Sequence, residues 1–217
     1  MCRREVGTAS LVRRFLGSLL RPLHRLLIRH VVVDDPWEPV TSFLVKPQIF
    51  GPGSLRMFPW YFEGESTVKV GTVDDVCRWL AECQYVPDEQ LFNEADFWQH
   101  PRTFEHLRKG DCEDHALWAW RKLVELGHRA ELFVGQWLGG ASHGQAHHAW
   151  VVFERDGQSF LLEPVTKDGT PAVRPLGDVR TDYVPHFSVD STFKMRSHAG
   201  YLLYLRDRDG HTRKQAA

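Results

Sequence analysis

The sequence predicts an α+β protein in which a helical layer packs on an antiparallel β-sheet. Helical patterns come first, over residues 72–127, and strand patterns follow from residue 131 onward. Between two strand patterns lies Asp156-Gly157, a dipeptide typical of β-hairpin turns. The 217 residues are 42% apolar and 25% charged, which excludes a disordered or polytopic membrane protein and is enough to bury a sizeable core.

Residues 1–33 predict a basic amphipathic helix. Residues 1–30 hold seven Arg against one Glu, and apolar residues between Val12 and Leu27 recur at three- and four-residue steps. The arginines interrupt every apolar run, so the pattern is neither an export signal nor a membrane-spanning helix. Three roles stay open for residues 9–30: binding an anionic membrane surface, binding a partner protein, or packing on their own domain. We therefore expect a cytoplasmic protein, peripheral at a membrane in the first case.

The remainder of the chain divides into three parts. Residues 34–70 are rich in Pro, Gly and aromatic side chains and predict a connector that wraps the domain. Residues 71–206 hold the helical and strand patterns and predict the main domain, and residues 207–217 form a polar tail. Because residues 31–217 carry 20 basic and 27 acidic side chains, they lack the basic surface that nucleic-acid binding needs.

Three helices are predicted in the first half of the main domain. Thr72 is a suitable N-cap for the first helix, which has acidic residues in its first turn and runs to about Gln84. A second helix covers about Arg102–Leu107. The third begins at Cys112 and ends near Gly127, a residue typical of helix C-termini.

Strands are predicted in the second half. The sequence predicts them at Glu131–Trp137, His148–Glu154 and Ser159–Glu163, and the predicted hairpin turn joins the last two. Two later apolar segments, Ala172–Pro175 and Tyr201–Arg206, predict additional strands.

The candidate chemistry begins at the segment Gly110-Asp111-Cys112-Glu113-Asp114. Gly110 allows a sharp turn and Asp111 can cap a helix, so that Cys112 falls in the first helical turn, where the dipole favours a thiolate. The flanking acids act in the opposite sense, because like charge raises the pKa of a thiol; they must point away or be offset by a cation or an imidazole. None of the four Cys forms a CxxC pair, and reduced thiols are expected.

A candidate base and an orienting acid follow on two predicted strands. His148 opens one strand and Glu163 ends the next, so a regular hairpin brings them together. Cys112, His148 and Glu163 would then be a nucleophile, a general base and the acid that fixes the imidazole tautomer. An isolated Cys is usually a core residue and an isolated His an ordinary polar residue. The combination of all three, in this order, favours a triad.

These residues resemble the bacterial transglutaminase-like cysteine peptidases. That family carries Asp-x-Trp-x-x-Pro and Gly-Asp-Cys-Glu-Asp-aromatic-Ala segments, which are similar to Asp96-Phe97-Trp98-Gln99-His100-Pro101 and Gly110-Asp111-Cys112-Glu113-Asp114-His115-Ala116. The wider superfamily carries His-Ala-hydrophobic and Asp-Pro-Thr motifs, which are similar to His148-Ala149-Trp150 and Glu163-Pro164-Val165. The resemblance covers about residues 70–165.

The resemblance implies a papain-like fold in which the Cys112 helix packs on an antiparallel sheet. It also implies thiol acyl transfer, most often hydrolysis of a peptide or amide bond. Cys112 would be the nucleophile, His148 the base and Glu163 the third member. Gln99 is suggested as an oxyanion donor, since an amide upstream of the nucleophile serves that role in papain-like enzymes. The family usually has Asp where this chain has Glu163, so one extra methylene has to be accommodated beside His148.

No cofactor and no metal site is predicted. Some relatives use the acids beside the nucleophile to bind calcium, and Asp111 and Glu113 are the corresponding pair, but two carboxylates are too few for a calcium site. A metal site from His143, His147 and His148 is disfavoured, because the segment is Gly-rich and typical of a loop that enters a strand.

Three functions from different classes are consistent with these features. The preferred one is a cysteine hydrolase that acts on a protein or peptide. The second is a thiol acyltransferase or cross-linking enzyme, in which an amine replaces water as the acyl acceptor. The third is a binding module that keeps the fold without turnover. In each case residues 34–64 and the loop Leu138–Ala146 are expected to form the walls of the substrate groove.

Overall fold

A computed structural model describes residues 32–40, 45–139, 146–165 and 172–206. Residues Pro36–Tyr201 form one compact unit, and the segments before and after them form another. The predictions for residues 1–31, for the tail 207–217 and for most of the loop Leu138–Ala146 lie outside the described residues. Within the described part, no helix has the length and apolar character needed to cross a membrane.

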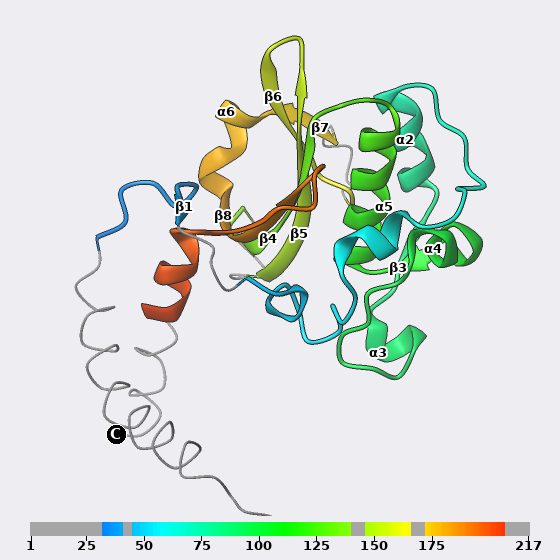
Figure 1. Cartoon of the computed structure of the whole chain (residues 1–217), viewed down its shortest axis with the longest axis horizontal. Coiled ribbons are helices and arrows are strands. Elements are labelled where there is room, and N and C mark those ends of the chain that lie inside the picture. The colour runs from blue at the N-terminus through cyan, green and yellow to red at the C-terminus, as the bar shows by residue number, and fades with distance from the viewer. Residues whose placement is uncertain (1–31, 41–44, 140–145, 166–171, 207–217) are drawn as a thin grey trace, which may run out of the picture. The chain divides into compact units, whose positions relative to one another are not determined.

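A seven-stranded sheet is the centre of the first unit (Figure 1). Its strand order is β1-β9-β8-β4-β5-β6-β7, and every pairing between neighbours is antiparallel. The strands are β1 (Pro39–Val40), β4 (Ala130–Trp137), β5 (Ala146–Arg155), β6 (Gln158–Leu162), β7 (Val173–Pro175), β8 (Tyr183–Asp190) and β9 (Met195–His198). A separate parallel ladder joins β2 (Gln84–Tyr85) to β3 (Lys109–Gly110).

Helices α2, α4 and α5 lie on one side of the sheet, and α6 lies on the other (Figure 1). The α-helices are α2 (Val73–Ala81), α3 (Asp88–Leu91), α4 (Pro101–Leu107), α5 (Cys112–Glu125) and α6 (Leu176–Val179). Three short 3-10 helices cover Pro47–Ile49, Phe58–Phe62 and Arg180–Asp182. The predicted fold class, α+β with the Cys112 helix packed on an antiparallel sheet, is confirmed.

The start of α2 follows from its first four residues. The Thr72 hydroxyl accepts a hydrogen bond from the Asp75 N–H at 3.1 Å, and the Asp75 carboxylate accepts one from the Thr72 N–H at 3.0 Å. This reciprocal capping box satisfies two backbone donors that the first turn leaves without helical partners. The predicted N-cap at Thr72 is therefore confirmed.

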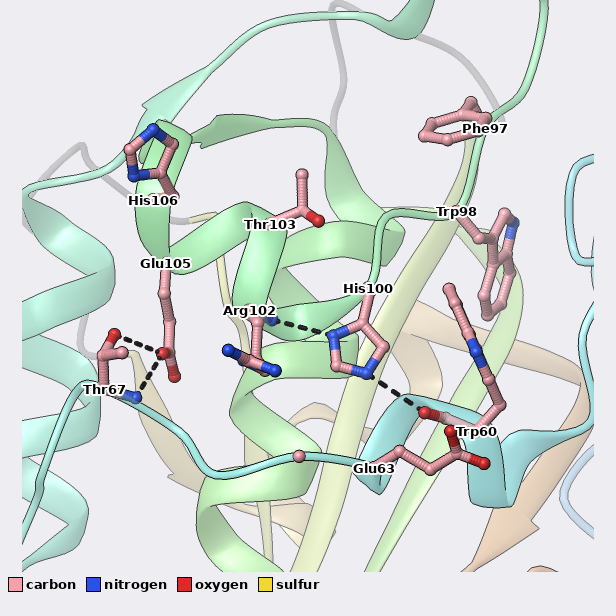
Figure 2. A pocket seen from close by; sticks show the side chains of 11 residues that line it. Trp60, Glu63, Thr67, Phe97, Trp98, His100, Arg102, Thr103, Glu105 and His106 are labelled. Carbon is pink, nitrogen blue, oxygen red and sulfur yellow. Dashed lines mark hydrogen bonds between the residues drawn. The ribbon is translucent and has the colours of Figure 1, made fainter.

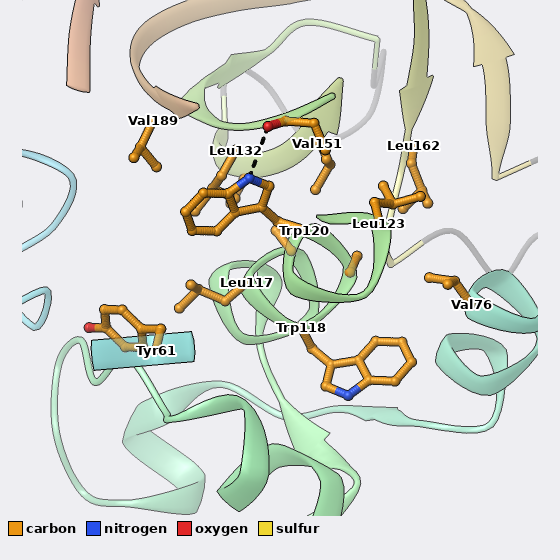
Figure 3. Packing of buried hydrophobic residues seen from close by; sticks show 14 of the residues in the cluster. Tyr61, Val76, Leu117, Trp118, Trp120, Leu123, Leu132, Val151, Leu162 and Val189 are labelled. Atoms are coloured by element: carbon orange, nitrogen blue, oxygen red, sulfur yellow. Dashed lines mark hydrogen bonds between the residues drawn. The ribbon is translucent and has the colours of Figure 1, made fainter. Parts of the chain in front are cut away.

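Helix α5 is the central element of the core (Figure 3). Leu117, Trp118 and Trp120 have no exposed surface, which is typical of a helix packed on all sides. The Trp118 ring stacks on Trp79 with centroids 3.9 Å apart, and the Trp120 indole N–H donates to the Ala130 carbonyl at 3.1 Å. Packing toward both α2 and β4 fixes the helix axis, and with it the position of Cys112 at the helix start.

The hairpin between β5 and β6 sets the register near the candidate site. Asp156 and Gly157 have φ values of 53° and 76°, the conformation of a type I′ turn. Val151 pairs with Leu162 across the two strands. Because side chains alternate along a strand, this register puts His148 and Glu163 on the same face as diagonal neighbours.

Two features of the sheet differ from the sequence prediction. Strands β8 and β9 were not predicted, and β8 lies in the interior of the sheet although Pro185 interrupts its apolar pattern. The proline is accommodated because the ladder shifts register between Val134 and Gly135, and Gly135 faces Pro185. A Cβ at Gly135 would lie 2.1 Å from the Val184 carbonyl oxygen, so only glycine fits there.

The strand predicted at Tyr201–Arg206 is wrong, because these residues are helical. A short apolar run without a clear period of two is compatible with either a strand or a helix, so the sequence pattern alone does not distinguish them here.

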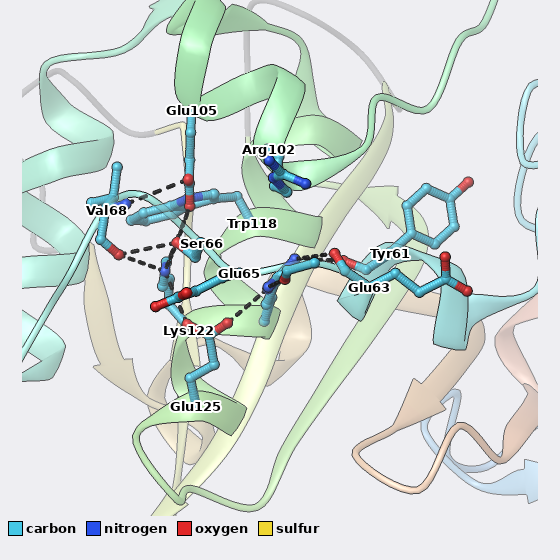
Figure 4. Close-up of polar contacts among 12 residues, drawn as sticks. Tyr61, Glu63, Glu65, Ser66, Val68, Arg102, Glu105, Trp118, Lys122 and Glu125 are labelled. Carbon is cyan, nitrogen blue, oxygen red and sulfur yellow. Dashed lines mark hydrogen bonds and ion pairs between the residues drawn. The ribbon is translucent and has the colours of Figure 1, made fainter.

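Arg121 and Lys122, adjacent on α5, bind the segment that precedes α2 (Figure 4). The Arg121 guanidinium donates to the carbonyls of Tyr61, Glu63 and Gly64 at 3.2, 3.3 and 2.5 Å. All three acceptors are backbone atoms, so this attachment depends on the path of the chain rather than on its side chains.

The Lys122 ammonium extends this attachment into the protein interior. It lies 3.5 Å from the Glu105 carboxylate, with both side chains about 1% exposed. It also donates to the Ser66 hydroxyl, to the Val68 carbonyl at 2.7 Å and to the Glu125 carboxylate at 2.9 Å. A buried ammonium is tolerated when it is paired and hydrogen-bonded in this way.

Candidate active site

The structure brings His148 and Glu163 together. The His148 Nε2 lies 2.9 and 2.8 Å from the two Glu163 carboxylate oxygens, and both side chains are largely buried. A carboxylate can only accept, so Nε2 carries a hydrogen, and the lone pair of the neutral imidazole is then on Nδ1. No hydrogen bond to Nδ1 is present among the described residues. The geometry thus provides an oriented imidazole with one basic nitrogen available.

Cys112 lies beside the strand that carries His148. It is the first residue of α5 and partly exposed, and the backbone N–H of Ala149 lies near enough to its sulfur to lower the pKa of the thiol. The thiol itself donates to the Glu113 carboxylate, with sulfur and oxygen 3.2 Å apart. In the described part of the chain no hydrogen bond joins Cys112 to His148. Such bonds are often absent from resting sites and form when the substrate is bound.

The pKa of the Cys112 thiol is raised well above its ordinary value. Desolvation of the sulfur is the largest cause, followed by the charges of Glu113 and Asp111, while the Ala149 N–H acts in the opposite direction. Burial and the two neighbouring acids therefore act together against the thiolate, and the acids neither point away from the sulfur nor are offset by His148. In this arrangement the resting cysteine is a neutral thiol.

Gln99 supports the start of α5. Its side-chain amide donates to the Lys109 carbonyl at 3.0 Å and to the Asp114 carboxylate, and its backbone N–H donates to Asp114 at 2.8 Å. Gly110 leaves room for this contact, since a Cβ there would lie 2.7 Å from the Gln99 amide nitrogen. Both amide hydrogens are engaged, and the role of Gln99 as an oxyanion donor stays a prediction.

Five acids and the nucleophile form a cluster at the start of α5. Asp88, Asp111 and Asp114 each offer a ligand atom within 4.8 Å of the others, and so do Asp88, Asp96 and Glu113. Sequence analysis singled out only Asp111 and Glu113. Asp96 opens the Asp-x-Trp-x-x-Pro segment, but that motif does not indicate a contact with Glu113, and Asp88 belongs to no recognisable motif, so only the fold brings these two acids to the cluster.

The carboxylates of the acidic cluster are crowded and buried, which disfavours their charged forms. Burial raises the pKa of Asp88 to about 6, and burial and neighbouring carboxylates hold the pKa values of Glu113 and Asp114 well above the ordinary range. Asp88 is 2% exposed, and its Oδ1 has no hydrogen-bond partner; the same holds for Oδ1 of Asp111. Crowded carboxylate oxygens with free lone pairs are the ligands that calcium prefers, so these residues fit such a cation.

A separate hollow of about 990 Å³ lies between α4 and the chain that precedes α2 (Figure 2). Trp60 and Phe97 contribute aromatic faces, and His100, Arg102 and His106 contribute polar groups. His100 is fixed by the Trp60 carbonyl at 3.1 Å and by the Arg102 N–H at 3.1 Å. None of the three predicted triad residues is part of this lining.

Comparison with known proteins gives matches in structure only. No family model matches the chain, and no curated protein matches it. Among solved structures, calcium-bound Legionella pneumophila LapG is 19% identical, with 68% of this chain and 80% of that chain covered and a TM-score of 0.46. A second L. pneumophila LapG structure is 17% identical, covers 79% of this chain and 98% of that chain, and has a TM-score of 0.46. An EGTA-treated form of LapG is 18% identical, with coverages of 73% and 93% and a TM-score of 0.44.

Proposed function

We propose that this chain is a transglutaminase-like cysteine hydrolase that cleaves a peptide or amide bond through an acyl-enzyme. Cys112 is the nucleophile, His148 the base and Glu163 the acid that orients the base. The observation that carries the proposal is the hydrogen bond from His148 Nε2 to Glu163. It leaves Nδ1 as the acceptor of the neutral imidazole, and His148 precedes Ala149, whose backbone N–H lies near the Cys112 sulfur. Nucleophile, base and orienting acid are the elements that covalent catalysis requires.

The reaction then proceeds in two halves. As the Cys112 sulfur attacks the carbonyl carbon, its proton passes to His148 Nδ1, a carbon–sulfur bond forms and the carbonyl oxygen becomes an oxyanion. When the oxyanion collapses, the carbon–nitrogen bond breaks and the leaving amine takes the proton from Nδ1. Water attacks the thioester with His148 again as base, and the acid product and the thiol are released. First-turn N–H groups of α5 lack helical partners and are suited to hold the oxyanion.

An electrophilic probe tests this proposal without knowledge of the substrate. A peptidyl acyloxymethyl ketone is expected to label wild-type protein at Cys112, and not the Cys112→Ala variant. Cys77 provides the matched control, because burial raises its pKa to about 11 and Cys77→Ala should leave labelling unchanged. If folded wild-type protein resists several such probes, the chain is a binding module.

A second experiment separates the two enzyme functions. The protein is incubated with a candidate peptide and a primary amine, and the products are identified. A free acid product indicates a hydrolase, and a new amide between peptide and amine indicates a transferase.

We also propose that the acidic cluster binds calcium and that this releases the nucleophile. Asp88, Asp96, Asp111 and Glu113 would supply oxygen ligands, and the bound cation would supply the positive charge that the cluster lacks. The Glu113 carboxylate accepts a hydrogen bond from the Cys112 thiol, with oxygen and sulfur 3.2 Å apart. Because a carboxylate bound to calcium is a poorer hydrogen-bond acceptor, the thiol would be free to donate to His148 instead. The proposal rests on the unpartnered, buried oxygen of Asp88 as well as on the number of acids.

Thermal unfolding provides a readout that is independent of activity. Calcium in excess is expected to raise the midpoint of unfolding relative to a chelator, because a cation that binds only the folded state stabilises it. Asp88→Asn should reduce this shift, whereas Asp74→Asn, an exposed acid of α2 outside the cluster, should keep it. Equal midpoints with calcium and with chelator would contradict the cation site and leave the triad proposal standing.

A further inference from the structure

The carboxylate of Glu163 is held by three donors. Its Oε1 accepts from the Val165 N–H at 3.2 Å and its Oε2 accepts from the Tyr183 hydroxyl at 2.9 Å, while the His148 Nε2 lies within 2.9 Å of both oxygens. One of these donors, Tyr183, comes from β8, a strand that sequence analysis did not predict. In the sheet order, β8 lies on one side of β4 and β5, and β6, which Glu163 follows, lies on the other side.

Tyr183 is itself fixed in place. It is 1% exposed and packs against the Trp150 ring at a centroid distance of 5.0 Å. Its hydroxyl oxygen accepts from the Arg174 guanidinium at 3.3 Å. Burial, and after it the Glu163 charge, raises the pKa of Tyr183, so the phenol keeps its hydrogen and acts as a donor.

We propose that Tyr183 is a positioning residue, which holds the Glu163 carboxylate in the orientation that His148 requires. The inference rests on the proposed function, because it gives the His148–Glu163 pair a role in catalysis. A glutamate side chain has three rotatable bonds, and a single contact to an imidazole leaves several rotamers accessible. The Tyr183 hydroxyl binds Oε2 and the backbone N–H of Val165 binds Oε1, so both carboxylate oxygens are held. Glu163 has one methylene more than the Asp of the family, and the additional donor Tyr183 limits the rotamers that this longer side chain can adopt.

The Tyr183→Phe variant tests the inference because it removes only the hydroxyl. We expect the rate of probe labelling at Cys112 to fall about tenfold, the effect of losing one charge-assisted hydrogen bond from the transition state. In ¹⁵N-histidine-labelled protein, the His148 Nε2–H resonance, assigned by its absence from His148→Ala, should broaden through exchange with water. Tyr61→Phe is the matched control, since Tyr61 is equally buried and does not contact the triad, and it should change neither quantity.

The direction of the spectral change separates positioning from simple competition for the carboxylate. If Tyr183 only competes with His148, its loss strengthens the remaining bond, so the resonance moves downfield without broadening and the labelling rate is unchanged; this result overturns the inference. Equal losses in Tyr61→Phe would do so as well. If Tyr183→Phe does not fold, replacement of tyrosine by the more acidic 3-fluorotyrosine, a stronger donor, should slow the exchange of the Nε2–H hydrogen with water, and an upfield shift without slower exchange is the outcome of competition and contradicts the inference. The resonance reports on Tyr183 even when no probe labels Cys112, so failure of the proposed function is recognised separately.

Discussion

Replacing His148 with Ala is expected to slow the labelling of Cys112 by an acyl-type probe by about 10²–10⁴-fold, the usual contribution of a general base. The physical reason is that the Cys112 thiol has a raised pKa and needs an acceptor for its proton. His148 Nδ1 provides that acceptor, since Nε2 is engaged by Glu163. Rates should be measured at several pH values by mass spectrometry of the labelled peptide.

The neighbouring histidine gives a matched control. His147 precedes His148 on β5 and lies on the opposite face of the strand, where its ring is 6.1 Å from that of His186. His147→Ala should therefore retain a labelling rate within a few-fold of wild type. If His147→Ala loses labelling and His148→Ala does not, the assignment of the base is reversed.

Replacing Lys122 with Met is expected to lower the free energy of unfolding by about 3–5 kcal/mol, the cost of breaking a buried ion pair by removing one partner. Methionine matches the length of the lysine stem, so the loss is mainly electrostatic. It leaves the Glu105 carboxylate buried with hydrogen bonds but without its cation. The measurement is urea unfolding of wild type and variant at neutral pH.

Two further variants distinguish the buried pair from a general effect of lysine removal. Lys122→Met combined with Glu105→Gln should be more stable than Lys122→Met alone, because the unpaired charge is gone. Lys69→Met, which removes an exposed lysine paired with Glu65, should change stability little. A loss in Lys122→Met no larger than in Lys69→Met would contradict the expected cost.

The pH dependence of Glu105 offers an independent check on this cluster. Burial alone would raise its pKa, but hydrogen bonds from Ser66, Thr67 and Trp118 outweigh burial and lower it to about 2. A carboxyl whose pKa is lower in the folded state stabilises the fold above its unfolded pKa and loses that contribution as the pH falls. Wild-type protein should thus lose stability between about pH 4.5 and 2 more steeply than Glu105→Gln does.

Much of the fold could be predicted because local signals agree with the tertiary structure. Thr72 and Asp75 form the expected cap, Asp156-Gly157 forms the expected turn, and α5 begins at Cys112 as the motif suggested. The interior strand β8 could not be predicted, because Pro185 argues against an interior strand. Only the register shift opposite Gly135, which depends on a partner strand, makes it compatible with the sheet.

The candidate site could be predicted only where its residues belong to short motifs. His148 and Glu163 lie on one hairpin, so their proximity follows from local register. Asp88 and Tyr183 meet this region only through the packing of elements distant in sequence, and neither has a spacing that marks it. The contact of the Cys112 thiol with Glu113 depends on side-chain rotamers, which a sequence pattern does not describe.

The interior position of β8 has a consequence for how the protein is made. A ribosome delivers Cys112, His148 and Glu163 before it delivers Tyr183, yet β8 lies between β4 and β9 in the finished sheet. A nascent chain that ends before residue 183 leaves the backbone donors and acceptors of β4 open along one side, where another chain could pair with them. Residues 183–198 thus both cover the open edge of β4 and complete the support of Glu163. Premature termination would therefore yield an aggregation-prone fragment in which the proposed nucleophile is present but its base is poorly aligned.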